Sequence, residues 1–187
     1  MSLNNKSRNV NETFERFVID NYKHVFNYIH MLVKDYEISK DVTQDTFLRA
    51  CAGFKRLRKK EKFTVWVMKI ARNLAFNRLK KERRRQRTFI SLFTKRYNGE
   101  LVDVIPDPAV PLEQRAGINE EKNVVRRVLY DLPSRMREIL ILKEWESLSY
   151  QQIGAVMKIS RKAVKSLLHR AREAARKRLE KEDIFKK

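Results

Sequence analysis

The chain has 187 residues, enough for one domain or two small ones, and 42% of them are hydrophobic, which excludes wholesale disorder. Its formal net charge of +20 predicts a polyanionic partner, either a nucleic acid or an acidic membrane face. No stretch approaches the ~18 apolar residues of a membrane span, and no apolar signal core is present near residue 1. We therefore expect a cytoplasmic protein without direct membrane insertion. The single cysteine, Cys51, excludes an internal disulfide, and its apolar helical surroundings predict a small buried side chain.

Apolar residues recur at three- and four-residue steps over 14–33, 42–54 and 63–75, which predicts three amphipathic helices. Ser39 is the expected N-cap of the second helix, and the basic stretch "KRLRKKEK" is expected to form a loop before the third. These elements define a first helical domain over residues 10–88.

Three of the four prolines fall within residues 106–111, in a segment with little periodicity. We expect an extended linker over 89–119 and a second helical domain over 120–182. The predicted fold is all-α, with two small helical domains joined by this linker and a helix-turn-helix in the C-terminal one.

Charge is segregated along the chain. Residues 54–87 hold fifteen basic and two acidic side chains, and residues 158–181 hold ten and two. The linker segment 98–121 holds one basic and six acidic side chains. This pattern predicts one basic surface on each domain, both facing a polyanion, with an acidic connection between them.

The stretch "SYQQIGAVMKISRKAVKSLLHRAR" is typical of a helix-turn-helix. Ser149 and Gln152 have the spacing of a capping box, and Ser160 is placed to cap the following helix. That second helix pairs an apolar stripe with a basic face, whose Arg and Lys suit guanine acceptors and phosphates in a major groove. The alternative is an ordinary amphipathic helix on the surface of a basic protein.

Aromatic side chains lie among the cations of the first basic zone. Phe63 and Trp66 could stack on unpaired bases while Lys and Arg hold the backbone, as in single-strand binders. Their helical spacing is, however, more often that of core residues. On the preceding helix, the polar face of "DVTQDTFLRACAGF" is either solvated or a protein-docking face, and its pattern leaves both open.

Catalytic signals are absent from the sequence: it has no Gly-rich phosphate loop, no paired-histidine metal spacing and no serine elbow. We therefore expect a protein that is not an enzyme and that has no cofactor and no metal site.

Three motifs in this order resemble bacterial RNA polymerase sigma factors of the extracytoplasmic-function (ECF) group, over roughly residues 12–180. "DVTQDTFLRACAGF" resembles their polymerase-binding helix. "FTVWVMKIARNLAFNRLKKERR" resembles their promoter-melting and minus-10-reading region. "DLPSRMREILILKEWESLSYQQIGAVMKISRKAVKSLLHRARE" resembles their minus-35-reading helix-turn-helix.

The resemblance implies that core RNA polymerase (its clamp and flap regions), promoter DNA and an anti-sigma factor are partners. It implies polymerase contacts by Asp41, Gln44, Asp45, Phe47, Leu48 and Arg49. It implies contacts with the minus-10 element and the melted strand by Arg58, Lys59, Lys60, Lys62, Phe63, Trp66, Asn73, Asn77 and Arg78. It implies minus-35 contacts by Lys143, Arg161, Lys162, Lys165, Ser166, His169 and Arg170.

The sequence departs from the family pattern at a few positions. Ser147 stands where Gly is common, and Lys143 and Lys165 stand where Arg is common. Lys lacks the bidentate fork that Arg offers to guanine. Two alternatives remain: a stand-alone helix-turn-helix transcriptional regulator, and a basic RNA-binding or membrane-surface protein.

Overall fold

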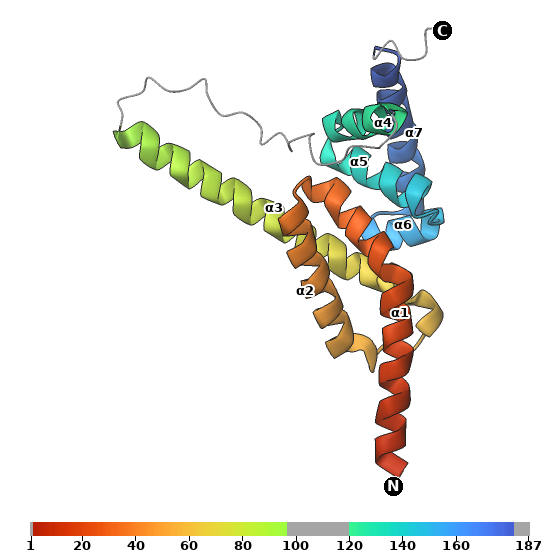
Figure 1. Ribbon diagram of the computed structural model, residues 1–187. Coiled ribbons are helices and arrows are strands. Elements are labelled where there is room, and N and C mark those ends of the chain that lie inside the picture. Colours follow the sequence, from red (N-terminus) through yellow and green to blue (C-terminus); the bar gives the residue numbers. More distant parts are fainter. Residues whose placement is uncertain (1, 97–119, 182–187) are drawn as a thin grey trace.

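The computed structural model describes residues 2–96 and 120–181, with side chains described over 13–87 and 124–181. Over these residues the chain is helical and has no strand, which confirms the all-α prediction (Figure 1). The helices are α1 (Ser2–Val33), α2 (Tyr36–Phe54), α3 (Phe63–Arg96), α4 (Glu120–Asp131), α5 (Ser134–Leu140), α6 (Tyr150–Met157) and α7 (Arg161–Leu179). A 3₁₀ turn, η1 (Lys60–Lys62), precedes α3, and a π-helical segment, η3 (Ile141–Trp145), continues α5.

Helices α1, α2 and α3 pack together around a cluster of aromatic rings. The Phe63 ring stacks on Phe17 with centroids 4.8 Å apart, and Phe14 meets Phe54 edge-on at 5.0 Å. The buried Asn21 links two of the helices, because its Oδ1 accepts a hydrogen bond of 2.8 Å from the Thr64 hydroxyl. This apolar cluster and the buried polar link fix the position of α3 against α1.

Two boundaries of the first domain differ from the prediction. The N-cap of α2 is Asp35, whose Oδ1 accepts from the Ile38 amide at 2.8 Å, and Ser39 lies buried inside the helix. Helix α3 extends to Arg96, so residues 89–96 are helical rather than linker. The reason is local, since no Gly or Pro interrupts the chain between Gly53 and Gly99. The rest of the predicted linker, 97–119, lies outside the described residues.

The helix-turn-helix of the second domain has the predicted caps. The Gln152 amide donates to the Ser149 hydroxyl at 3.3 Å, and the Gln152 side chain accepts from the Ser149 amide at 2.8 Å. The Ser160 hydroxyl accepts from the Ala163 amide at 3.2 Å at the start of α7. These caps satisfy amides that the helix starts leave unpaired.

The corner between α6 and α7 contains a lysine in a left-handed conformation, Lys158, with φ of 56°. A side chain in this region costs about 1–2 kcal/mol, whereas glycine adopts it freely. We expect Lys158→Gly to raise the free energy of unfolding by about 0.5–1 kcal/mol after the extra entropy of the unfolded chain is counted. Lys165→Gly, at an exposed position within α7, is the matched control and is expected to lower it by about 1 kcal/mol.

Chemical denaturation followed by circular dichroism measures both changes. A lower stability for Lys158→Gly than for the parent chain would contradict the left-handed conformation of this residue.

The two helical domains pack directly against each other. Helices α5 and η3 contact α1, and α6 contacts α3 (Figure 1). One apolar cluster is continuous from Val25 in α1 to Ala171 in α7. The sequence predicted two separate domains, and their packing is therefore a finding of the structure.

Candidate nucleic-acid interface

Helix α7 presents a basic face to solvent. Its apolar stripe, which includes Val164, Leu168 and Ala171, is buried in the second domain. The residues predicted to meet the minus-35 element on this helix are all exposed: Arg161, Lys162, Lys165, Ser166, His169 and Arg170. The structure thus brings these six predicted residues together on one accessible helix, with the geometry that a major-groove reader requires.

Lys143 lies on η3, beside the start of α6. Its Nζ donates to the Leu148 carbonyl at 3.4 Å and lies 5.6 Å from the centre of the Tyr150 ring. Another cation of α7, Arg172, is paired with Glu144 at 2.8 Å within the same domain. These contacts hold η3 and the segment before α6 in place.

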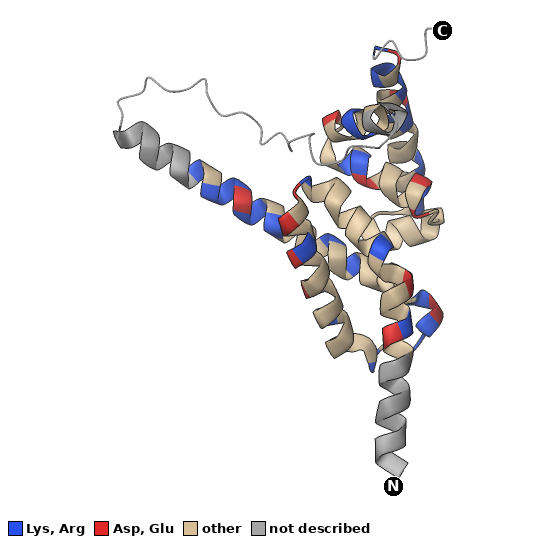
Figure 2. Cartoon of the chain, in the orientation of Figure 1, with Lys and Arg blue, Asp and Glu red and all other residues tan. Residues whose placement is uncertain are grey.

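Helix α3 forms the second basic surface, and the Lys and Arg positions along its ribbon are blue in Figure 2. Asn73 and Asn77, predicted to contact the minus-10 element, are exposed, while Arg78 is half-buried and pairs with Glu82 at 3.3 Å. The predicted amide groups are therefore accessible, and Arg78 has an acidic partner on its own helix.

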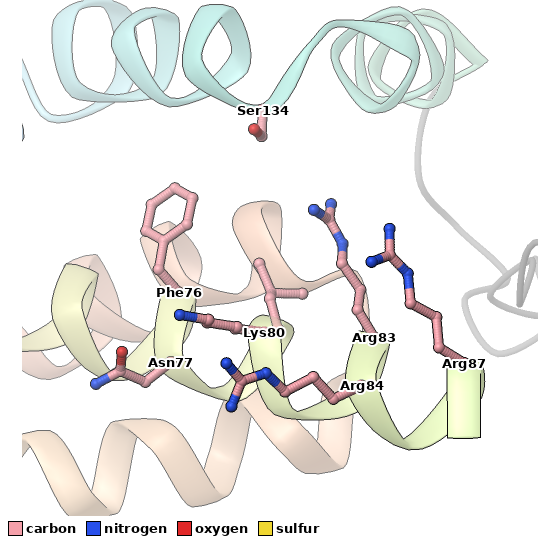
Figure 3. A pocket seen from close by; sticks show the side chains of 8 residues that line it. Phe76, Asn77, Lys80, Arg83, Arg84, Arg87 and Ser134 are labelled. Carbon is pink, nitrogen blue, oxygen red and sulfur yellow. The ribbon is translucent and has the colours of Figure 1, made fainter. Parts of the chain in front are cut away.

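A cleft of about 590 Å³ continues this surface towards the second domain. Figure 3 shows Phe76, Arg83 and Arg87 extending from α3 towards the segment that carries Ser134. The cleft is lined by Phe76, Asn77, Leu79, Lys80, Arg83, Arg84, Arg87 and Ser134. The sequence analysis noted the charge density of this zone but did not name the four cations that line the cleft. Their three- and four-residue spacing, which places them on one face of a helix, was the signal that could have identified them.

The basic loop before α3 is only partly available to a ligand. Arg58, Lys59 and Lys62 are exposed. Lys60 instead donates to the Phe54 carbonyl at 2.9 Å and lies 3.2 Å from the centre of the Phe54 ring. Burial lowers the pKa of Lys60. This lysine therefore caps the end of α2 in the structure.

Phe63 does not have the exposure that base stacking requires. Its ring is 1% exposed and packs among the aromatic rings of α1 and α2. Trp66, half-buried with its ring centre 5.8 Å from that of Phe63, remains partly accessible. Phe63 is therefore a core residue, as its helical spacing had favoured. Of these two aromatic rings, only that of Trp66 is accessible to a base.

The outer face of α2 combines polar and apolar side chains. Of the residues predicted to meet polymerase, Asp41, Gln44, Asp45, Leu48 and Arg49 are exposed. Phe47 is buried beneath them, and its ring stacks on Tyr22 with centroids 5.7 Å apart. Cys51 on this helix is exposed, so the prediction that it is buried was wrong.

Four large apolar side chains on α1 and α2 are accessible. Ile19 is 75% exposed, Leu48 61%, Tyr36 53% and Tyr22 46%. An apolar group of this kind with carboxylates close to it in the chain is typical of a protein-binding surface.

Charged side chains also meet between the two domains, in a contact that no sequence motif indicated. The Arg72 guanidinium binds both oxygens of the Glu138 carboxylate, at 2.5 Å and 3.3 Å. The Tyr28 hydroxyl donates to the same carboxylate at 3.1 Å. A second pair joins His24 to Glu146 at 2.9 Å.

Burial dominates the electrostatics of these interdomain groups. It raises the pKa of Glu138, although the Arg72 and Tyr28 hydrogen bonds act in the opposite direction. Burial also raises the pKa of Tyr28 well above its ordinary value, so its hydroxyl keeps the proton that it donates. The pKa of Glu146 is also raised, because the effect of burial exceeds the opposing effect of His24.

Within residues 2–96 and 120–181, no helix is long and apolar enough to cross a membrane. In the same part of the chain, no group of three or more His, Cys, Asp or Glu side chains is placed to hold a metal ion.

Two family models match the parts of the chain that carry these surfaces. The family model "Sigma-70 region 2" matches residues 17–85, which include α2 and the basic part of α3. The model "Sigma-70, region 4" matches residues 122–174, which include the helix-turn-helix. The chain belongs to the sigma-70 family. As a sigma factor of the ECF group, it acts with RNA polymerase in promoter-specific transcription initiation.

Curated relatives of this sigma factor carry ECF names. The ECF RNA polymerase sigma factor SigW of Bacillus subtilis is 25% identical over 163 residues, which cover 87% of each chain. The ECF RNA polymerase sigma-E factor of Salmonella typhimurium is 30% identical over 135 residues, covering 72% of this chain and 70% of that protein.

A solved structure supports the fold. The sigma factor RpoE of Bartonella quintana, solved in complex with the anti-sigma factor NepR, matches with a TM-score of 0.68 at 20% identity. The match covers 90% of this chain and 98% of RpoE.

Proposed function

We propose that this sigma factor binds core RNA polymerase through α2, reads the minus-35 element with α7 and reads the minus-10 element with α3. It acts in the cytoplasm, without enzymatic activity and without a cofactor. The observation that supports this most is the presence of an exposed basic helix in each family-matched region. Duplex opening draws its free energy from binding unpaired bases rather than from nucleotide hydrolysis.

In this proposal the N-terminal half of α7 binds the minus-35 element. The contacting residues are Arg161, Lys162, Ser166 and His169, together with Lys165 and Arg170. We expect Arg170→Ala or Lys165→Ala to weaken minus-35 binding by about 1–3 kcal/mol, because each removes a cation from the groove. Polymerase binding is expected to stay unchanged. The measurement is a titration of the holoenzyme with promoter fragments at fixed salt, since salt alters such affinities strongly.

Arg176→Ala is the matched control for these substitutions. Arg176 lies beyond the proposed reading half of α7 and pairs with Glu180 at 3.0 Å, so its loss is expected to leave minus-35 affinity nearly unchanged. A promoter footprint that is unaltered by both Arg170→Ala and Lys165→Ala would exclude the assignment of α7 as the reading helix.

The melted strand is held, in this proposal, by the exposed cations of the basic loop and by side chains of α3. Arg58, Lys59 and Lys62 contact the backbone, and Trp66 offers the accessible aromatic face. Asn73 and Asn77 contact base edges of the minus-10 element. The cations that line the cleft beside Asn77 continue the same phosphate-binding surface.

Polymerase and anti-sigma contacts are proposed for the remaining surfaces. The exposed apolar group on α1 and α2, with Asp41, Gln44, Asp45 and Arg49, meets the clamp region, and the second domain meets the flap region. A related sigma factor of the same fold was solved with an anti-sigma factor. We extend that kind of partner to this chain as part of the proposal.

One reconstitution tests the proposal as a whole. Purified protein added to core polymerase is expected to produce transcription from specific promoters, and the polymerase alone is not. The stand-alone regulator, the second candidate function, predicts binding to a palindromic operator with no requirement for polymerase. Specific DNA binding without any stimulation of core polymerase would favour that alternative.

A further inference from the structure

Gly53 lies in the last turn of α2, directly against the indole of Trp66. A Cβ atom at Gly53 would lie 2.9 Å from Cζ2 and 3.3 Å from Cη2 of that ring. Two carbon atoms in ordinary contact are about 3.5–4.0 Å apart. The edge of the six-membered ring of Trp66 therefore occupies the space that a side chain at Gly53 would need.

The backbone of α2 does not require a glycine at this position. Gly53 lies two residues before the C-cap, Lys55, and does not have the left-handed φ that favours glycine. Glycine is also a poor helix former, because it loses the most backbone freedom when a helix forms. What the missing side chain provides here is the close approach of the Trp66 ring to α2.

The Trp66 ring has a second fixed neighbour. The Phe63 ring lies 5.8 Å away between centroids, with 59° between the two planes. Phe63 is 1% exposed and stacks on Phe17, so it has little freedom to move aside. Trp66 itself is half-buried. Contacts with Gly53 and Phe63 thus hold the indole while part of it stays accessible.

We propose that Gly53 is a positioning residue for Trp66: its missing side chain lets the indole edge rest on α2 and so sets the orientation in which the ring stacks on an unpaired base. This inference rests on the proposed function for the role of Trp66 as the stacking ring. An added methyl group forces the ring to withdraw or turn by about 0.5–1 Å, which disturbs stacking without removing aromatic surface. The same helix carries the residues proposed to bind polymerase, so the docked helix also positions the ring.

The first arm of the test measures the ring in the free chain, without DNA. Trp66 and Trp145 are the two tryptophans, so Trp145→Phe leaves Trp66 as the source of tryptophan fluorescence. In that background, Gly53→Ala is expected to shift the emission to longer wavelength and to increase its quenching by acrylamide. Ala52→Gly is the matched control, because it exchanges the same two amino acids in the opposite direction at an exposed position of the same turn. It adds no atom near Trp66 and is expected to change neither signal.

The second arm measures how the holoenzyme holds the melted strand. The probe is a promoter fragment from the reconstitution above whose strands are left unpaired across the minus-10 element. Gly53→Ala is expected to lower the affinity for this fragment about three- to tenfold, which is part of what a stacking ring contributes. Ala52→Gly is expected to leave it unchanged. The affinities of Gly53→Ala for core polymerase and for paired minus-35 DNA are expected to match those of the parent chain.

A double variant separates positioning from general damage. Trp66→Phe has a smaller ring without the two edge atoms that meet Gly53, so an added methyl group has nothing to displace. Gly53→Ala is therefore expected to have no further effect on strand affinity in the Trp66→Phe chain. An equal effect in both backgrounds would overturn the proposed role of Gly53.

Two further results would overturn it: emission and quenching of Trp66 that Gly53→Ala leaves unchanged, or an unchanged affinity for the unpaired fragment where Trp66→Ala lowers that affinity. Either result leaves the proposed function standing. A Trp66→Ala holoenzyme that binds the unpaired fragment as tightly as the parent would instead count against Trp66 as the stacking ring, and so against that part of the proposed function.

Discussion

Phe63→Ala is expected to lower the free energy of unfolding by about 3–5 kcal/mol, as truncation of a buried Phe generally does. The ring is 1% exposed and contacts Phe17 and Phe54 on the two neighbouring helices. Its loss leaves a cavity where α1, α2 and α3 meet. Denaturant unfolding of the purified chain measures the change.

Asn73→Ala is the matched control for Phe63→Ala. Asn73 is exposed on the same helix, so its substitution is expected to change stability by no more than about 0.5 kcal/mol while reducing promoter opening. If Phe63→Ala instead unfolded like the parent chain and lost only single-strand binding, the ring would be a base-stacking group despite its burial.

Asp45→Lys is expected to weaken the affinity for core polymerase by at least about tenfold. Asp45 is exposed on the face of α2 proposed to bind the polymerase. A lysine there would face the basic group that complements Asp45, and such a contact between like charges costs several kcal/mol. The measurement is a binding titration of labelled core polymerase, with minus-35 DNA binding followed separately.

Asp131→Lys provides the same change of charge away from that face. Asp131 is exposed at the end of α4, where a cation is favourable to the helix dipole, and its substitution is expected to leave polymerase affinity unchanged. Equal affinities for Asp45→Lys and the parent chain would remove α2 from the proposed polymerase-binding surface.

The helix-turn-helix was predictable because its signals are local. The Ser149 and Ser160 caps act within three residues of themselves, and the spacing of Val164, Leu168 and Ala171 determines which face of α7 is buried. The same logic placed the exposed residues of α2 on one face. Each of these predictions depended on one helix and its immediate flanks.

The interdomain contact was not predictable, because it joins residues 66 positions apart through tertiary packing. Arg72 counted in the sequence as one more cation of a basic zone, and Glu138 as an ordinary helical acid. Phe63 shows a related limit: periodicity puts it and Trp66 on similar faces, and only the packing of α1 separates a buried ring from an accessible one.

If the Arg72–Glu138 contact favours a closed arrangement in which the two domains pack together over an open one in which they separate, it also limits how strongly the free protein can bind DNA. If only the open form is competent, the apparent dissociation constant equals the intrinsic one divided by the open fraction. A closed form favoured by about 1.4 kcal/mol therefore reduces apparent promoter affinity about tenfold. A polymerase that binds the open form preferentially removes this reduction, and by reciprocity promoter DNA then tightens polymerase binding by the same factor. One buried carboxylate would in this way make promoter recognition conditional on assembly of the holoenzyme.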